Sequence, residues 1–284
     1  MSDEISSVSQ QELKSLYKNN LPNLNFFEPK EFSKHHVPKD DNNFFTGIII
    51  GPSGTGKNVI YEELHKYWFN KQYDKFVIFS QSIKKKSKKK GSYDFIDQKR
   101  IVKYNDYDHN YLKAIMDHND ELDEMNKPMI KTLVVFDDCL DKKTKDDDVI
   151  IKACKQGRHH SVSTMFIQQD VINQLSAECR SQANLWIFLQ QGSKERRISI
   201  SKEYFSHLSS DEFTGNMKDS EFWSQLIKRY TIEIEYGALI IFPRPLGDVR
   251  FNFMNNVFQY KVPYKSTLIL KNRTYINIYI CMLP

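Results

Sequence analysis

A glycine-rich segment carries the residue types best suited to chemistry. Gly51-Pro-Ser-Gly-Thr-Gly-Lys57 satisfies the pattern G-x-x-x-x-G-K between an apolar run and a stretch with helical spacing. Its glycines allow a tight turn whose backbone N–H groups point at phosphate oxygens, and the positive end of the next helix faces the same anion. Lys57 can reach the β- and γ-phosphates. The pattern predicts an ATP site formed by Gly51, Pro52, Ser53, Gly54, Thr55, Gly56, Lys57 and Asn58.

Asn58 departs from the usual form of this segment, in which a serine or threonine hydroxyl contacts Mg²⁺. The side-chain carbonyl oxygen of an asparagine can bind the metal directly or through water. We therefore expect Asn58 to weaken magnesium affinity or slow turnover rather than abolish hydrolysis. A site that has lost its activity is the alternative at this point.

Two adjacent acids follow a second apolar run, Leu133-Val-Val-Phe-Asp137-Asp138. Asp137, at the end of the expected strand, is placed to hold the hydration shell of Mg²⁺. Asp138 stands where related hydrolases carry a glutamate that polarises the attacking water, and its side chain is one methylene shorter. Two candidate strands, residues 75–80 and 100–104, lie between the two motifs, which fits additional-strand ATPases better than simple nucleotide kinases.

The remaining pattern alternates strands with helices, which predicts an α/β fold with a mostly parallel, doubly wound sheet. Further strands are expected at 44–50, 132–136, 161–167, 185–189, 231–242 and 249–253, and helices at 9–18, 59–69, 111–125, 149–155, 171–180 and 222–227. Residues 1–43 form a polar lead-in and 44–192 the ATPase core. Residues 193–284 form a small β-rich extension that either completes the sheet or makes a separate appendage. In such sheets the ligand sits beyond the carboxyl ends of the strands, where the polar residues described above lie.

A third motif gives a family resemblance. Gly157-Arg-His-His-Ser-Val-Ser-Thr-Met-Phe-Ile-Gln168-Gln169 resembles the "G-R-H … S … Q" segment of poxvirus-type genome-packaging ATPases of the FtsK–HerA superfamily. The resemblance covers roughly residues 44–189, with all three motifs in order. It implies a RecA-like P-loop core in a ring, a pentamer or hexamer, that pumps double-stranded DNA into a capsid. It also implies capsid vertex or portal proteins as partners, and matches Gln169 to the polar sensor residue of the strand that follows the acidic strand.

A ring ATPase also needs an arginine donated to the γ-phosphate of the neighbouring subunit. Arg158 and Arg180 are the candidates, with Arg158 ahead because it lies in the matched segment; Arg196 and Arg197 are weaker candidates. A purely structural role stays open for Arg158 and Arg180. His159 and His160 are expected to be structural or loop residues, and nothing near Cys154 completes a set of metal ligands.

The composition is ordinary for a soluble protein, and the mildly basic charge permits a polyanionic partner without requiring one. The 284 residues carry a formal net charge of +5, and a lysine run lies at Lys84, Lys85, Lys86, Lys88, Lys89 and Lys90. This run is a candidate for sequence-independent contact with DNA phosphates, and a solvated loop is the alternative. No stretch reaches the ~18 apolar residues of a membrane span, and no secretory signal is visible. We therefore expect no membrane partner. The resemblance to genome-packaging ATPases implies a location in the host cytoplasm, in a virus factory or with the virion.

Two other classes of function remain open from the sequence. A nucleoside or nucleotide kinase would share the phosphate-binding segment, although no arginine-rich lid is evident. A non-catalytic assembly protein could use nucleotide binding as a structural switch, and the departures at Asn58 and Asp138 are compatible with it. The leading interpretation is an ATP-driven DNA translocase.

Overall fold

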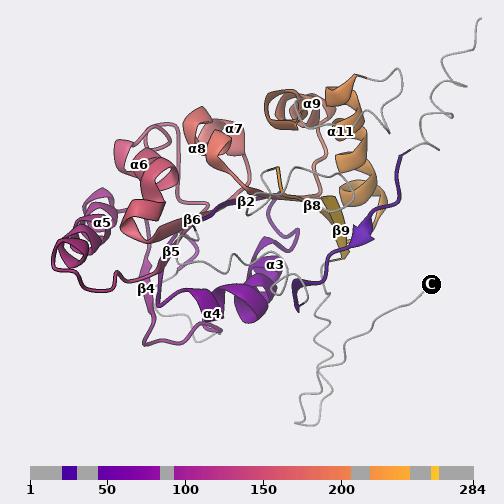
Figure 1. Ribbon diagram of the computed structural model, residues 1–284. Helices are drawn as coiled ribbons and strands as arrows, with labels where there is room; N and C mark the ends of the chain where they lie inside the picture. The colour runs from indigo at the N-terminus through magenta and orange to yellow at the C-terminus, as the bar shows by residue number, and fades with distance from the viewer. Residues whose placement is uncertain (1–20, 31–43, 84–92, 206–217, 244–256, 262–284) are drawn as a thin grey trace, which may run out of the picture.

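A single mixed sheet organises the computed structural model, which describes residues 21–30, 44–83, 93–205, 218–243 and 257–261 (Figure 1). Within these residues the sheet has nine strands in the order β1-β9-β8-β7-β2-β6-β5-β3-β4. The strands are β1 (Asn25–Phe26), β2 (Thr46–Ile50), β3 (Lys75–Ser80), β4 (Ile101–Tyr104), β5 (Thr132–Asp137), β6 (Val162–Gln168), β7 (Leu185–Leu189), β8 (Gly237–Ile241) and β9 (Val257–Lys261).

The six strands from β7 to β4 run parallel, which confirms the predicted class of fold. β6 lies between β2, which precedes the glycine-rich segment, and β5, which ends in the acids. All three carboxyl ends therefore meet at one edge of the sheet. Beyond β7, the strands β8 and β9 continue the sheet in antiparallel fashion, and β1 pairs with β9. The described parts of the C-terminal extension and of the lead-in thus add to the main sheet.

Helices cover both faces of the sheet. They are α3 (Lys57–Leu64), η1 (His65–Phe69), α4 (Asn70–Gln72), α5 (His109–Glu124), α6 (Asp148–Gln156), η2 (Gly157–His160), α7 (Val171–Gln174), α8 (Ala177–Gln182), α9 (Lys194–Ile200), η3 (Ser201–Phe205), α11 (Asp219–Lys228) and η4 (Arg229–Glu233). α3 and α4 lie on one face, whereas α5, α6, α7, α8, α9 and α11 lie on the other (Figure 1). Polar side chains start several of these helices: Ser176 caps α8 and Ser193 caps α9.

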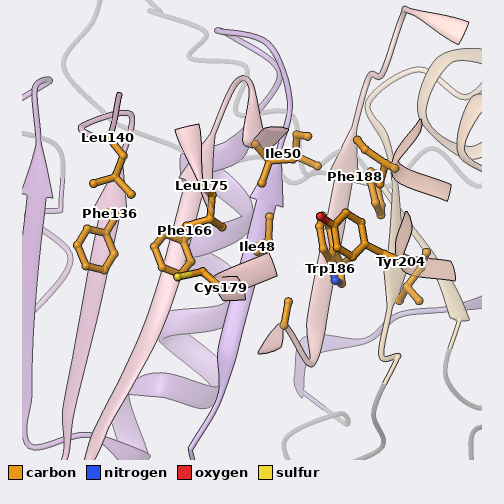
Figure 2. Packing of buried hydrophobic residues seen from close by; sticks show 14 of the residues in the cluster. Ile48, Ile50, Phe136, Leu140, Phe166, Leu175, Cys179, Trp186, Phe188 and Tyr204 are labelled. Atoms are coloured by element: carbon orange, nitrogen blue, oxygen red, sulfur yellow. The ribbon is translucent and has the colours of Figure 1, made fainter. Parts of the chain in front are cut away.

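The central strands are buried on both faces, as their continuous apolar sequences predict. Successive residues alternate between two cores, so that Ile48 and Ile50 belong to one and Ile49 to the other. Figure 2 shows the first core, in which Phe136 and Phe166 stack with their centroids 4.9 Å apart. Because both faces are packed, the strand ends that carry the polar residues have fixed positions.

Two expected elements differ in the structure. The predicted helix 171–180 is two short helices, because Ser176 accepts a hydrogen bond from the Cys179 amide and starts α8 anew. The predicted strand 231–242 begins only at Gly237, since the π-helical turn η4 continues α11 as far as Glu233. The expected helix at 9–18, the expected strand at 249–253 and the lysine run at 84–90 lie outside the described residues.

Candidate nucleotide-binding site

The glycine-rich segment forms an exposed turn between β2 and α3. Gly54 and Gly56 have φ values of 79° and 97°, a left-handed conformation that favours glycine. A Cβ on Gly51 would lie 2.9 Å from the Leu189 carbonyl oxygen, so the close approach to β7 also requires glycine. Gly56 caps α3 without a side-chain hydrogen bond, and a Cβ placed on Gly54 would meet no atom within 4 Å. The turn therefore has open space for an anion.

Lys57 is buried at the start of α3 and bonds to the turn itself. Its Nζ donates to the carbonyl oxygens of Gly51, at 2.8 Å, and Pro52, at 3.3 Å. The Asp138 Oδ2 lies 3.6 Å from the same Nζ. Lys57 is thus held at the point where the turn faces the acidic strand end, and incoming phosphate oxygens would replace its two carbonyl acceptors.

Asp138 joins the ends of β5 and β6. It has a φ of 48°, and its amide donates to the Ile167 carbonyl oxygen at 2.9 Å. The Gln169 Nε2 donates to Asp138 Oδ2 at 2.9 Å. The other carboxylate oxygen, Oδ1, is buried and has no hydrogen-bond partner among the described residues. An orphaned, buried carboxylate oxygen is costly and is suited to a missing water or ligand group.

Asp137 is buried more deeply than Asp138. Its Oδ2 accepts hydrogen bonds from the Ser80 and Tyr93 hydroxyls, each at 2.8 Å. Burial raises the pKa of the Asp137 carboxyl; the two hydroxyl donors and Lys57 act against that rise, while Asp138 adds to it. An ion beside Asp137 would stabilise the ionised form, so the residue fits the expected magnesium role.

Asn58 lies exposed in the first turn of α3, one residue after Lys57. Its place next to the exposed phosphate turn is compatible with contact to a metal or to its waters. Taken together, the open turn, the orphaned Asp138 oxygen and the buried Asp137 carboxylate form a site whose residues fit Mg²⁺-bound ATP.

The structure argues against Arg180 as the arginine donated to a neighbour. Arg180 is 7% exposed, and its guanidinium donates to Glu203 Oε1 at 3.0 Å, to the Ile172 carbonyl oxygen at 3.2 Å, and to Leu175 and Tyr204. These bonds tie α7 and α8 to η3 within one chain.

Arg158 is exposed and bonds to the adjacent His159 Nε2 at 3.2 Å. It precedes β6, whereas Gln169 follows it, and the strand has seven residues. At a rise of about 3.3 Å per residue, Arg158 lies roughly 20 Å from Gln169 along the strand. Arg158 therefore cannot contact Gln169 of its own chain.

The two weaker arginine candidates both lie in α9. The Arg196 guanidinium pairs at 3.0 Å with the carboxylate of Asp170, the residue that directly follows Gln169. Arg197 is buried and donates to the Gln191 and Gly192 carbonyl oxygens, the latter at 2.8 Å. Arg197 thus holds the end of β7 in its own chain, which leaves Arg158 and Arg196 as the more exposed guanidinium groups of this set.

His160 has contacts that fit the structural role expected of it. His160 is buried against Asp120, and its carbonyl oxygen accepts a bond from Asn119 Nδ2 at 2.6 Å. Among the described residues, one group of three could hold a metal ion: His109, Asp147 and Asp148. The Asp147 carboxylate in this group already accepts hydrogen bonds from Tyr107, from His109 and from two backbone amides of α6. Asp147 therefore serves as the N-terminal cap of α6.

Sequence reasoning missed Ser80 and Tyr93. Ser80 is the last residue of an apolar strand, and its Cα pairs with Asp137 across β3 and β5, so its polar position was a usable signal. Tyr93 has no such signal, because it lies far from Asp137 in the sequence and follows the lysine run.

The fold and the site together define an additional-strand P-loop ATPase, with β6 inserted between the strands that carry the phosphate turn and the acids. The family described as "Poxvirus A32 protein" matches residues 30–196, more than half of the chain, and the chain belongs to this family. This match confirms the resemblance to poxvirus-type genome-packaging ATPases. Among curated proteins, no sequence matches the chain.

Two solved structures are similar to this chain. The pCW3 conjugation coupling protein TcpA, in a monomer form with ATPγS, is 13% identical with a TM-score of 0.51, covering 84% of this chain and 69% of TcpA. The genome-packaging NTPase B204 of Sulfolobus turreted icosahedral virus 2, in complex with ATPγS, is 16% identical with a TM-score of 0.47. That match covers 72% of this chain and 94% of B204. The similarity to TcpA supports the α/β P-loop fold.

Proposed function

We propose that this chain is an ATP-hydrolysing motor that moves double-stranded viral DNA into a capsid. Membership of the Poxvirus A32 protein family supports the proposal. The observation that carries it is the meeting of Lys57, Asp138 and Gln169 at one edge of the sheet, beside an open phosphate turn. The insertion of β6 between β2 and β5 favours this ATPase over a nucleotide kinase.

Each residue of this cluster has a distinct role in hydrolysis. Lys57 neutralises charge on the β- and γ-phosphates, exchanging its two carbonyl acceptors for phosphate oxygens. Asp138 accepts a proton from the attacking water, and its orphaned Oδ1 is the oxygen free to do so. Gln169, bonded to Asp138, orients that water or senses the γ-phosphate. Bound Mg²⁺, held by Asp137 and Asn58, would draw charge from the phosphates.

Assembly completes the site in this proposal. The subunits form a ring, a pentamer or a hexamer, in which Arg158 of one subunit reaches the γ-phosphate of the next. The lysine run at 84–90 contacts DNA phosphates without regard to sequence, and capsid vertex or portal proteins receive the ring. Residues 44–192 act as the motor core. No helix among the described residues is long and apolar enough to cross a membrane. We place the protein in the host cytoplasm, in virus factories or with the virion.

The test is the rate of ATP hydrolysis with and without long double-stranded DNA, alongside size analysis in the presence of nucleotide. We expect DNA to raise the rate several-fold and nucleotide to favour the assembled form. Replacing the six lysines between 84 and 90 with glutamine should remove the stimulation by DNA but leave the basal rate. A rate that responds to nucleosides and not to DNA would indicate a kinase instead.

A further inference from the structure

Two buried hydroxyl groups converge on one oxygen of Asp137. The Ser80 and Tyr93 hydroxyls each donate to Oδ2 at 2.8 Å, and their residues are 0% and 2% exposed. No described residue donates a hydrogen bond to Oδ1 of the same carboxylate. The two donors fix the rotation of the carboxylate, because turning it would break both bonds and leave buried groups unpaired.

Tyr93 is held for this contact in an unfavourable backbone conformation. Its φ is 70°, a left-handed value that costs a bulky aromatic residue of order 1–3 kcal/mol. Its ring packs edge-on against Tyr61 at 5.6 Å, and Tyr61 belongs to α3, the helix that begins at Lys57. Such strain persists where the surroundings fix a residue strongly, and it often marks functional sites. The Tyr93 side chain thus connects the helix of the phosphate turn to the acidic strand.

We propose that Tyr93 and Ser80 are positioning residues that orient the Asp137 carboxylate, leaving Oδ1 as the oxygen available to magnesium or its bound waters. The inference rests on the proposed ATPase function. Two hydroxyl donors offset the cost of burying the carboxylate and hold it in a single orientation before the metal binds. Without either donor, the carboxylate would have to be ordered by the metal itself, which weakens binding.

The same cluster provides a matched control. The Tyr61 hydroxyl is buried and has no hydrogen-bond partner in the part of the chain that the structure describes, although its ring touches Tyr93. Tyr61→Phe therefore removes a hydroxyl from the same aromatic cluster without removing a bond to Asp137. Tyr93→Phe removes a hydroxyl of the same kind together with that bond.

The experiment measures the affinity of the full chain for ATPγS with and without Mg²⁺, by calorimetry. We expect Mg²⁺ to tighten binding to the parent protein. In Tyr93→Phe and in Ser80→Ala this gain should fall about tenfold, the order expected for one lost hydrogen bond to a charged group. Binding without Mg²⁺ should stay within about twofold of the parent. Tyr61→Phe should match the parent in both conditions.

Hydrolysis gives a second readout. In Tyr93→Phe the Mg²⁺ concentration for half-maximal rate should rise, with most of kcat recovered at saturating Mg²⁺. If Tyr93→Phe does not fold, as judged by thermal unfolding without nucleotide, Ser80→Ala decides the question.

Three outcomes would overturn the inference. If Mg²⁺ increased the ATPγS affinity of Tyr93→Phe as much as that of the parent, this inference would fail while the proposed ATPase function would stand. The same would follow if Tyr61→Phe lost as much of the Mg²⁺-linked affinity as Tyr93→Phe, because the loss would then come from packing. A parent protein that gains no affinity from Mg²⁺ would overturn the proposed ATPase as well.

Discussion

Asp138 is the residue on which the polar contacts of the site converge. Its Oδ2 lies 3.6 Å from Lys57 Nζ and 2.9 Å from Gln169 Nε2, so one carboxylate joins the phosphate turn to the end of β6. Its φ of 48° turns the side chain out of the strand direction that Asp137 follows. Two consecutive acids therefore serve different purposes: Asp137 is buried between hydroxyls, and Asp138 faces the nucleotide turn.

The first prediction concerns Asp138→Asn. The amide cannot accept the proton of the attacking water, so kcat should fall by about 10²–10⁴-fold. ATP affinity should change little, because Lys57 and the turn amides remain. Steady-state hydrolysis and ATPγS binding, measured on the same preparation, check this result. Hydrolysis at the parent rate would show that another group accepts the proton.

The second prediction concerns Asn58→Thr. A hydroxyl at this exposed position should bind the metal better than the amide, so the Mg²⁺ concentration for half-maximal hydrolysis should fall several-fold. Asn58→Ala, which lacks any ligand atom, should move in the opposite direction. Titration of the rate with Mg²⁺ distinguishes these cases. A large loss of activity in Asn58→Thr would instead show that the site is adapted to asparagine.

At the scale of elements, Arg180 fastens α7 and α8 to η3. The third prediction is that Arg180→Ala lowers the free energy of unfolding by about 3 kcal/mol, since it breaks several buried bonds to a charged group. Arg158→Ala should change stability by less than about 0.5 kcal/mol, because Arg158 is exposed. Denaturant unfolding of both variants compares them. Equal stabilities would contradict the structural role of Arg180.

The elements that could be predicted from the sequence are those with strong local signals. The buried strands and the phosphate turn follow from continuous apolar runs and from glycines at fixed spacing. The order of strands in the sheet has no such local signal, so the place of β6 between β2 and β5 required the structure.

Thr231 illustrates a different limit of prediction from the sequence. Its β-branched surroundings favour a strand, but burial beside β8 and a hydrogen bond from the Gln191 amide keep it in a helical turn.

The same contrast holds within the candidate site. Lys57, Asp138 and Gln169 each end or follow a recognisable motif, and in the structure Asp138 contacts both of the other two. Asp137 instead accepts hydrogen bonds from the Ser80 and Tyr93 hydroxyls. These contacts depend on tertiary packing, which the sequence does not reveal. The burial of Arg180 likewise depends on Tyr204 and Glu203, which are remote in the sequence.

At the scale of the whole molecule, the phosphate turn lies at the carboxyl ends of the parallel strands, whereas Arg158 lies before the amino end of β6. This arrangement is suited to a ring. The fourth prediction is that Arg158→Ala lowers DNA-stimulated hydrolysis by about 10³-fold or more in the assembled form. Mixing it with Lys57→Ala subunits should restore part of the activity, because a Lys57→Ala subunit still donates Arg158 to an intact neighbouring site. Hydrolysis assays on mixtures of defined ratio measure this recovery. Full activity of Arg158→Ala alone would assign the role elsewhere, with Arg196 the next candidate.

The most direct test of the account is the structure of the chain bound to ATPγS and Mg²⁺. It should place Lys57 Nζ and Gln169 Nε2 within hydrogen-bonding distance of the terminal phosphate, with Asp138 facing the water opposite the leaving group. A nucleotide bound away from the turn at 51–57, or a terminal phosphate remote from Gln169 and Asp138, would contradict the account.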